Sequence, residues 1–255
     1  MRFTIVTVCF NSAATIGQTL ASVAAQDFDD YEHLVVDGLS TDGTKAIVTA
    51  QANPRLRWVS EADAGMYDAM NKGLRMAKGD YVLFLNSDDY LVRDDALSLV
   101  SAKIDETEAD CILADTMFVK ADGSPAARRY SARNFGRWWM RVGVMPPHPS
   151  TFARRTLLQS AGGFDTRYRI AADFDLMARV FLKQRASWAS LAAVTTAFRL
   201  GGVSTGQLRA NARIGREAAH SLKALGQRSA GLAVQLRFLL KARQYFRFGR
   251  DRQGL

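Results

Sequence analysis

The chain has 255 residues, of which 48% are hydrophobic and 23% are charged, with 19 glycines, 5 prolines and 2 cysteines. This composition predicts a folded globular protein and excludes a disordered chain, a collagen-like repeat and a disulfide-stapled scaffold. No apolar run approaches the ~20 residues of a membrane span, and the amino-terminal residues lack the small-residue cleavage site of a signal peptide, so we expect a cytoplasmic protein that is not integral to a membrane. Cys9 and Cys111 fall in separate strand-like segments and are expected to be buried, reduced thiols.

The net charge of +9 is concentrated in the last fifth of the chain. Residues 1–200 carry 23 basic and 23 acidic side chains, whereas residues 201–255 carry 11 basic side chains and two acidic ones, Glu217 and Asp251. This distribution predicts a neutral body followed by a basic extension, rather than a protein that is basic throughout.

Strand-like and helix-like segments alternate along the first 115 residues. Strands are predicted at residues 3–9, 31–37, 56–60, 81–85 and 111–114, and helices at residues 12–26, from about 44, at 63–78 and near 94–103. This βαβ alternation predicts an α/β fold with a mainly parallel central sheet flanked by helices. Ligands bind such sheets beyond the carboxyl ends of the strands, so Asn11, Asp37 and residues 86–89 are expected at one edge.

From residue 116 the pattern becomes irregular. It predicts a hairpin around Asp122 and Gly123, a helix near residues 172–183 and a strand near residues 192–200. The basic extension has the pattern of two helices interrupted around residues 226–231.

Two adjacent carboxylates, Asp88 and Asp89, follow the apolar run of residues 81–85. Negative charge near a buried edge is costly unless a positive group neutralises it. A divalent cation such as Mg²⁺ or Mn²⁺, which prefers carboxylate, phosphate and water oxygens, would do so while bridging a diphosphate. The alternative is that the pair opens a turn or caps the next helix.

Asp37 and residues 60–73 add further polar groups near the same edge. A carboxylate at the position of Asp37 can accept hydrogen bonds from a nucleobase or a ribose, although an Asx turn before Gly38 is the simpler interpretation of that residue alone. Asp63 is a plausible N-cap of the following helix, and Asn71 lies one helical turn after Asp68, so both could face one ligand.

Asp173 lies among apolar residues, and such a carboxylate can have the raised pKa that suits a general base; helix capping is the alternative. His148 lies in a proline-rich turn and could face a metal, a phosphate or an acceptor. The three histidines show no zinc-binding spacing, and the chain has no GxSxG, P-loop or GxGxxG motif.

In this order and at these intervals, the motifs resemble family 2 glycosyltransferases of the GT-A fold over roughly residues 3–200, most closely the bacterial branch that builds surface polysaccharides such as colanic acid. The matching segments are residues 4–11 (TIVTVCFN), 22–26 (SVAAQ), 35–44 (VVDGLSTDGT), 60–73 (SEADAGMYDAMNKG) and 79–89 (GDYVLFLNSDD). The resemblance implies a catalytic GT-A domain at residues 1–205, with a nucleotide-sugar-binding half at 1–115 and an acceptor half at 116–205. Residues 206–255 would form a basic helical extension.

The resemblance also implies a role for each matching residue. Residues 86–88 occupy the DXD position with asparagine in the first place, and Ala172 stands where the family has the glutamate of its Glu-Asp motif. The implied roles are donor binding by Asn11, Asp37, Asp63, Asn71 and Asn86, divalent metal binding by Asp88 and Asp89, acceptor contact by His148, and catalysis by Asp173.

The implied reaction is an inverting, metal-dependent transfer of a sugar, for example from a UDP-sugar, to a hydroxyl of a glycan or lipid-linked glycan. Asp173 would deprotonate that hydroxyl, and the metal would stabilise the departing diphosphate. A sugar-phosphate nucleotidyltransferase is the alternative, but it needs a glycine-rich basic loop after the first strand, where this chain has Cys-Phe-Asn-Ser-Ala-Ala. A nucleic-acid-binding protein is suggested by the basic extension alone, and because the body is neutral we expect no nucleic-acid partner.

The segment 228–255 holds seven basic residues beside a leucine-rich helical face. It could be an amphipathic helix attracted to an anionic membrane surface, where it would bring the protein to a lipid-linked acceptor. It could equally pack on the catalytic domain with a solvated basic face.

Overall fold

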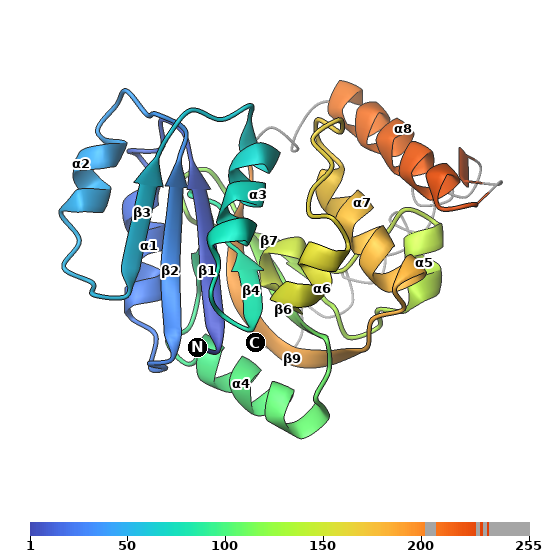
Figure 1. Cartoon of the computed structure of the whole chain (residues 1–255), viewed down its shortest axis with the longest axis horizontal. Helices are drawn as coiled ribbons and strands as arrows, with labels where there is room; N and C mark the ends of the chain where they lie inside the picture. The colour runs from blue at the N-terminus through green and yellow to red at the C-terminus, as the bar shows by residue number, and fades with distance from the viewer. Residues whose placement is uncertain (202–207, 228–229, 232–233, 235–255) are drawn as a thin grey trace.

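The structure is a computed structural model, and it describes residues 1–201, 208–227, 230–231 and 234 of the chain (Figure 1). The described strands are β1 (Phe3–Cys9), β2 (Tyr31–Asp37), β3 (Leu56–Ser60), β4 (Tyr81–Phe84), β5 (Tyr90–Leu91), β6 (Cys111–Val119), β7 (Pro125–Tyr130), β8 (Thr151–Arg154) and β9 (Trp188–Arg199). The described helices are α1 (Ile16–Ala24), α2 (Thr44–Thr49), α3 (Met66–Met76), α4 (Ala96–Thr107), α5 (Arg137–Arg141), α6 (Arg155–Ser160), α7 (Ala172–Ala178) and α8 (Leu208–Ala224), with a 3₁₀ turn at His148–Ser150 and a π-helical turn at Arg179–Lys183.

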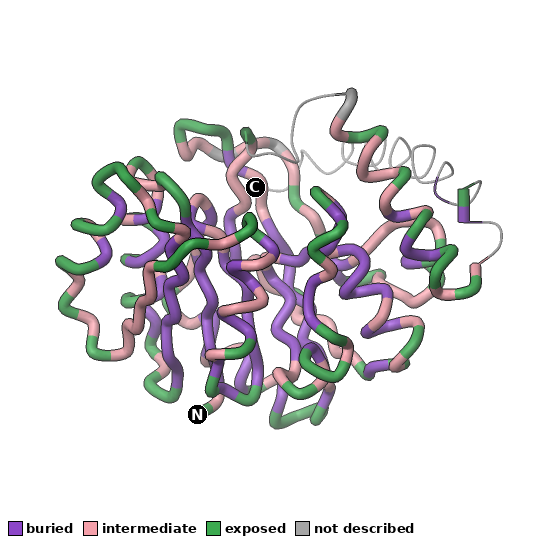
Figure 2. Tube along the Cα trace, turned by 45° about the horizontal axis from the view of Figure 1, so that its top comes forward, coloured by how far each residue is buried: buried purple, intermediate pink, exposed green. Residues whose placement is uncertain are grey.

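The first half of the sheet is parallel, as the βαβ pattern predicts. β1 pairs in parallel with β2 and β4, and β2 pairs in parallel with β3. Every residue of β1, β2 and β4 is buried (Figure 2). Val6 and Leu34 pack with α3 on one face, while Cys9 and Val35 pack with α1 on the other. Burial on both faces explains why these strands read as continuous apolar runs.

The second half of the sheet is mixed. The order is β3-β2-β1-β4-β8-β6-β9-β5, with β7 paired to β6. β8 lies antiparallel between β4 and β6, whereas β9 runs parallel to β6 and antiparallel to β5. The predicted α/β class with a central sheet between helices is confirmed, and the parallel arrangement is confined to β1–β4 and the β6–β9 pair.

Some predicted boundaries were wrong. The helix expected at residues 12–26 begins at Ile16, because the carbonyl of Ser12 closes a turn by accepting bonds from the amides of Thr15 and Ile16. The helix expected from residue 63 begins at Met66, after Gly65 in a left-handed conformation (φ 118°). The strand expected at residues 111–114 continues to Val119, because it pairs with β9 along its whole length.

The central sheet contains strands from both proposed halves of the catalytic domain, residues 1–115 and 116–205. α8 follows these residues in the chain and packs against α7 (Figure 1). α8 ends at Ala224, just before Gly226 with φ 88°, close to the predicted interruption. Most of the predicted second helix of the extension and most of the proposed membrane-binding segment 228–255 lie outside the described residues. Within the described part of the chain, no helix is long and apolar enough to cross a bilayer.

We predict that Gly79→Ala destabilises the fold. A Cβ at residue 79 would lie 2.3 Å from the carbonyl carbon of Phe3 and 2.4 Å from the amide nitrogen of Thr4. Because both are backbone atoms of β1, the free energy of unfolding should fall by about 1–3 kcal/mol in urea denaturation. Gly17→Ala in α1 is the matched control, since its Cβ would make an ordinary 3.9 Å contact with Ile47. Wild-type stability of Gly79→Ala would contradict this packing.

Candidate active site

The carboxyl ends of β1, β2 and β3 meet at Asp37. In the sheet register Asp37 lies between Cys9 and Ser60, and its side chain is 1% exposed. Its carboxylate accepts hydrogen bonds from the amide and hydroxyl of Ser40 (3.2 and 2.5 Å) and from the hydroxyl of Ser60 (2.6 Å). Burial and the adjacent carboxylate raise the pKa of the Cys9 thiol to about 12, so this cysteine stays protonated at neutral pH.

Asn11 and Asp63 lie against the same turn. Asn11 has a left-handed backbone conformation (φ 50°). Its backbone amide donates to the Ser40 hydroxyl (2.8 Å), and its side-chain oxygen accepts the backbone amide of Thr41 (2.9 Å). A Cβ at Gly38 would lie 2.5 Å from a carboxylate oxygen of Asp63. The structure therefore brings Asn11, Asp37 and Asp63 together around the turn at residues 38–41.

The segment 86–89 follows β4, whose carboxyl end lies beside that of β1. Asp89 is fully buried, and one carboxylate oxygen accepts the amide of Arg199 at 3.0 Å. The other oxygen of Asp89 and the side-chain oxygen of Asn86 have no hydrogen-bond partner among the described residues. Burial, with a smaller contribution from Asp88, raises the pKa of Asp89 well above its usual range. Burial also raises the pKa of Asp88.

Arg199, which the sequence analysis missed, is the positive group beside these carboxylates. Its guanidinium donates to the carbonyl oxygens of Asp88 (3.2 Å) and Ala121 (2.7 Å) and to the side chain of Gln18 (2.6 Å). The end of β9 thereby holds the 86–89 turn against α1 and the β6–β7 hairpin. Two adjacent carboxylates near a buried edge predict a positive group beside them, but nothing in the sequence identifies which arginine it is.

The residues present fit a divalent cation that is shared with a phosphate ligand. Asp88 and Asp89 supply carboxylates, and Asp89 has an unpartnered oxygen within the described structure. No group of three or more histidine, cysteine, aspartate or glutamate side chains suited to a metal occurs among the described residues. Mg²⁺ sites of this kind use one or two protein carboxylates and complete the coordination with phosphate and water.

Asp173 lies in the first turn of α7 and is partly exposed. Desolvation raises its pKa to about 6, Glu217 adds to this rise, and the amide of Phe174, which donates to the carboxylate at 2.7 Å, opposes it. Its charge also contributes to the raised pKa of Tyr67, which is buried, and of Tyr130, which is partly exposed. A carboxylate with a pKa near 6 is ionised at neutral pH and is basic enough to accept a proton in a reaction.

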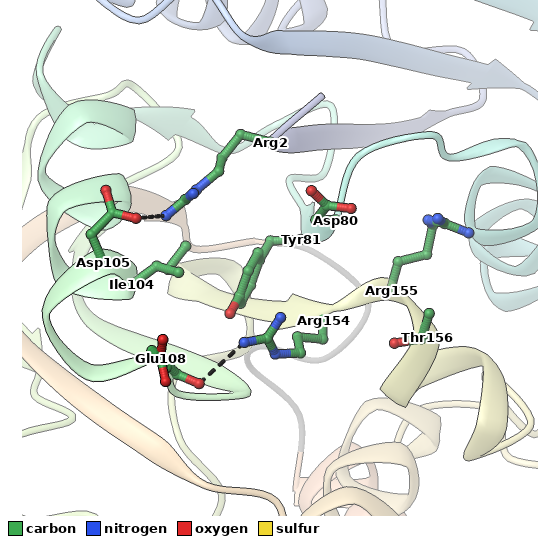
Figure 3. Close-up of a pocket in the computed structure, with 9 residues that line it drawn as sticks. All are labelled: Arg2, Asp80, Tyr81, Ile104, Asp105, Glu108, Arg154, Arg155 and Thr156. Carbon is green, nitrogen blue, oxygen red and sulfur yellow. Dashed lines mark hydrogen bonds and ion pairs between the residues drawn. The ribbon is translucent and has the colours of Figure 1, made fainter.

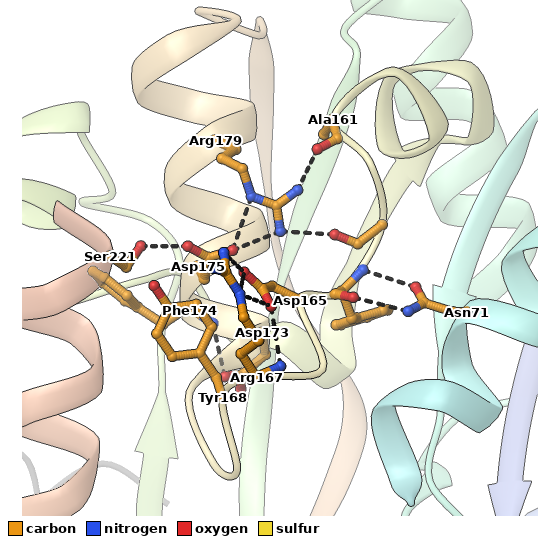
Figure 4. A network of polar contacts seen from close by, with 12 residues as sticks. Asn71, Ala161, Asp165, Arg167, Tyr168, Asp173, Phe174, Asp175, Arg179 and Ser221 are labelled. Carbon is orange, nitrogen blue, oxygen red and sulfur yellow. Dashed lines mark hydrogen bonds and ion pairs between the residues drawn. The ribbon is translucent and has the colours of Figure 1, made fainter. Parts of the chain in front are cut away.

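Asn71 holds the loop before α7 (Figure 4). Its side-chain nitrogen donates to the carbonyl of Phe164, and its side-chain oxygen accepts the amide of the same residue, both at 2.8 Å. Gly163, at φ 66°, has no room for a Cβ because Asn71 would lie 2.5 Å from it. The predicted donor-binding residue therefore has a structural contact that the sequence did not indicate.

His148 is buried in an aromatic cluster. Its ring stacks on Phe84 at 5.8 Å and meets the edge of Phe164 at 5.9 Å, while Phe164 also stacks on Tyr67 at 5.6 Å. Burial lowers the pKa of His148 to about 4, so the ring is neutral at physiological pH. Tyr67 donates its hydroxyl to the carbonyl of Ile170. This cluster joins the end of β4 to the loop that precedes Asp173.

A separate hollow lies at the opposite end of β1 and β4 (Figure 3). It is lined by Arg2, Asp80, Tyr81, Ile104, Asp105, Glu108, Arg154, Arg155 and Thr156. Arg2 pairs with Asp105 at 2.6 Å, and the guanidinium of Arg154 lies over the Tyr81 ring. Three arginines and three acidic residues line this hollow, so it has no excess charge for a diphosphate, and it lies away from the carboxylates described above.

Comparison with known proteins identifies relatives. The model of the family described as "Glycosyl transferase family 2" matches residues 4–171. A PGL/p-HBAD biosynthesis glycosyltransferase of Mycobacterium bovis and Mycobacterium tuberculosis is 36% identical over 183 residues, which cover 70% of this chain and 69% of the relative. The poly(ribitol-phosphate) beta-N-acetylglucosaminyltransferase TarS of Staphylococcus aureus is 35% identical over 130 residues, which cover 49% of this chain and 22% of TarS.

Solved structures share the fold. S. aureus TarS 1–349 in complex with UDP-GlcNAc superposes with a TM-score of 0.70 and 24% identity, covering 87% of this chain and 66% of that one. The mannosyltransferase PcManGT of Pyrobaculum calidifontis, in complex with GDP-Man and Mn²⁺, superposes with a TM-score of 0.66 and 21% identity, covering 88% and 64%. The chain thus spans slightly less than two thirds of these two solved proteins. Because the family model matches well over half of the sequence, the chain belongs to glycosyltransferase family 2, with the GT-A fold.

Proposed function

We propose that this glycosyltransferase moves a sugar from a nucleotide-sugar, with a UDP-sugar as the first candidate, to a hydroxyl of a glycan or lipid-linked glycan in the synthesis of a bacterial surface polysaccharide or glycolipid. The observation that carries the proposal is that the aromatic cluster of His148, Phe164 and Tyr67 links the end of β4, which precedes the carboxylate turn at residues 86–89, to the loop that precedes Asp173. Relatives named for PGL/p-HBAD biosynthesis and for N-acetylglucosaminyl transfer support it.

The nucleoside would bind at the turn of residues 38–41. Asn11, Asp37 and Asp63 converge there, and a carboxylate at a strand end can accept bonds from a base or a ribose. Because both oxygens of Asp37 already accept bonds from Ser40 and Ser60, we assign it the shaping of this turn as well as ligand contact. Asn71 would act beside the donor by holding the loop at Phe164.

The diphosphate would lie at residues 86–89, bordered by Asn86. Asp88 and Asp89 would hold Mn²⁺ or Mg²⁺, which supplies charge stabilisation to the departing diphosphate when bound. The guanidinium of Arg199 orients this turn through the Asp88 carbonyl. Asp173 would take the proton from the acceptor hydroxyl as that oxygen attacks the anomeric carbon from the face opposite the leaving group, which inverts the configuration.

His148 would shape the acceptor side as a neutral aromatic ring, because its low pKa leaves it uncharged. We place the reaction in the cytoplasm, in keeping with two buried, free cysteines. Attachment to an anionic membrane through residues 228–255 remains part of the proposal, and most of that segment lies outside the described residues.

A nucleotide-sugar screen tests the proposal as a whole. A true donor should raise the melting temperature in the presence of Mn²⁺, and transfer should release free nucleoside diphosphate. Release of pyrophosphate instead would favour the alternative nucleotidyltransferase. The absence of stabilisation by every UDP- and GDP-sugar would contradict the proposal.

We predict that Asp173→Asn abolishes transfer and preserves donor binding. The amide has nearly the same shape but cannot accept the proton, so turnover should fall by at least about 10²-fold while donor-induced stabilisation is unchanged. Asp105→Asn, a surface change at the other end of the sheet, is the matched control. Full turnover in Asp173→Asn would remove this residue from the mechanism.

The pH dependence of wild-type turnover follows from the same pKa. Because the base must be ionised, kcat should decline as the pH falls through about 6, the pKa of Asp173. Initial rates between pH 5 and pH 8, in buffers of constant ionic strength, measure this decline. A rate that stays constant down to pH 5 would contradict proton transfer to Asp173.

We predict that Asp88→Asn weakens the dependence of nucleotide binding on metal. With one carboxylate ligand removed, the apparent Mn²⁺ affinity in the presence of UDP should fall by more than about tenfold. Titration of Mn²⁺ at fixed UDP, followed by melting temperature, measures this effect. An unchanged Mn²⁺ titration would exclude Asp88 as a ligand; Asp105→Asn again serves as the control.

A further inference from the structure

The amino-terminal end of α7 is held by a carboxylate from another helix. Glu217 of α8 accepts the amides of Ile170 at 3.0 Å and Ala171 at 2.9 Å with one oxygen, and the amide of Arg169 at 3.3 Å with the other. These amides belong to the N-cap residue of α7 and to the two residues before it, none of which pairs within the helix. Glu217 therefore holds the chain segment that enters α7, across the α7–α8 interface.

The position of Glu217 is fixed by the packing of α8. Ala218 and Leu222 are completely buried, and Ser221 donates its hydroxyl to a carboxylate oxygen of Asp175 at 2.6 Å (Figure 4). Residues 217, 218, 221 and 222 fall on one helical face, which therefore faces α7. The ring of His220 bonds the hydroxyl of Tyr168 at 2.9 Å, so α8 contacts the loop before α7 at a further point.

The amides held by Glu217 belong to the residues directly before the helical turn that carries Asp173. A shift in residues 169–171 would tilt this turn and move the carboxylate of Asp173 with it. In the same loop, the carbonyl of Ile170 accepts a hydrogen bond from the hydroxyl of Tyr67. Glu217 thus completes a set of contacts that determine where the base lies, although it is outside the segment that matches the family model.

We propose that Glu217 is a positioning residue that orients Asp173 by holding the backbone of residues 169–171. The inference rests on the proposed function, since it assigns Glu217 a role through the base of that reaction. It also gives part of the carboxyl-terminal extension a catalytic purpose that does not depend on membrane binding.

Two substitutions separate geometry from charge. Glu217→Ala removes all three acceptor contacts, whereas Glu217→Gln keeps one oxygen that can accept the amides of Ile170 and Ala171. Ser221→Ala is the matched control on the same face of α8, because it removes a contact to Asp175 and leaves residues 169–171 untouched. Glu106→Gln controls for the loss of a surface charge.

Hydrogen exchange measured by mass spectrometry reports on the backbone without any substrate. In Glu217→Ala the amides of residues 169–171 should exchange faster. The amides of Ile170 and Ala171 in Glu217→Gln, and all three amides in Ser221→Ala, should stay close to wild type. Unchanged exchange in Glu217→Ala would overturn the proposal. The hydrogen-exchange measurement needs no enzymatic activity, so it tests the contact between Glu217 and residues 169–171 even if the proposed function is wrong.

Turnover of the donor found in the nucleotide-sugar screen provides the second arm, with UDP-GlcNAc plus Mn²⁺ as the first probe. In Glu217→Ala kcat should fall on the order of 10- to 100-fold with the donor KM unchanged, as expected for a misplaced catalytic group. Faster exchange with wild-type kcat would overturn the positioning role. A wild-type protein that is inactive with every nucleotide-sugar would instead disprove the proposed function.

The pH profile separates positioning from a purely structural effect. Tyr67 of α3, Tyr130 of β7 and Glu217 of α8 are the titratable groups from neighbouring elements that interact with Asp173. Desolvation dominates the raised pKa of Asp173 and the charge of Glu217 adds to it, so Glu217→Gln should move the acidic limb of kcat slightly to lower pH, with near-wild-type kcat at neutral pH. A loss of kcat at neutral pH in Glu217→Gln as large as that in Glu217→Ala would contradict a role through the contacts with Ile170 and Ala171.

Discussion

Negative charge held away from water is the constraint on which the proposed active site depends. Asp37 and Asp89 are buried, and Asp173 is partly exposed, although desolvation raises its pKa. Donors offset part of this cost: two serine hydroxyls and the Ser40 amide for Asp37, and one backbone amide each for Asp89 and Asp173. The cost that remains is greatest at Asp89, where one oxygen lacks a partner within the described structure, so a cation would stabilise this edge most at that point.

The parallel half of the sheet could be predicted because its signals are local. β1, β2 and β4 are buried on both faces, so each appears as a short continuous apolar run, and the intervening helices show their own periodicity. The direction of β8 and its position between β4 and β6 depend on contacts between distant residues. No local pattern encodes such contacts, and the same holds for the extension of β6 to Val119.

The carboxylates could be identified from the sequence because acidic residues that directly follow apolar runs form a recognisable local pattern. The residues that contact this site could not be identified in this way, because Arg199 lies 110 residues from Asp89 and Glu217 lies 46 residues from Ala171. Asn71 shows the converse difficulty. An exposed helical amide and one that binds a backbone loop have the same sequence pattern, and the contact with Phe164 became visible only when the loop was placed beside α3.

The insertion of β8 between β4 and β6 has a consequence for biosynthesis of the protein. On the ribosome, residues 1–115 emerge with one side of β4 lacking its neighbour, and the gap closes only after residues 151–154 have been translated. An unpaired strand edge in a nascent chain invites intermolecular pairing, and closure over such a distance is slow. The enzyme should therefore depend on chaperones more than a sheet assembled from successive neighbouring strands would.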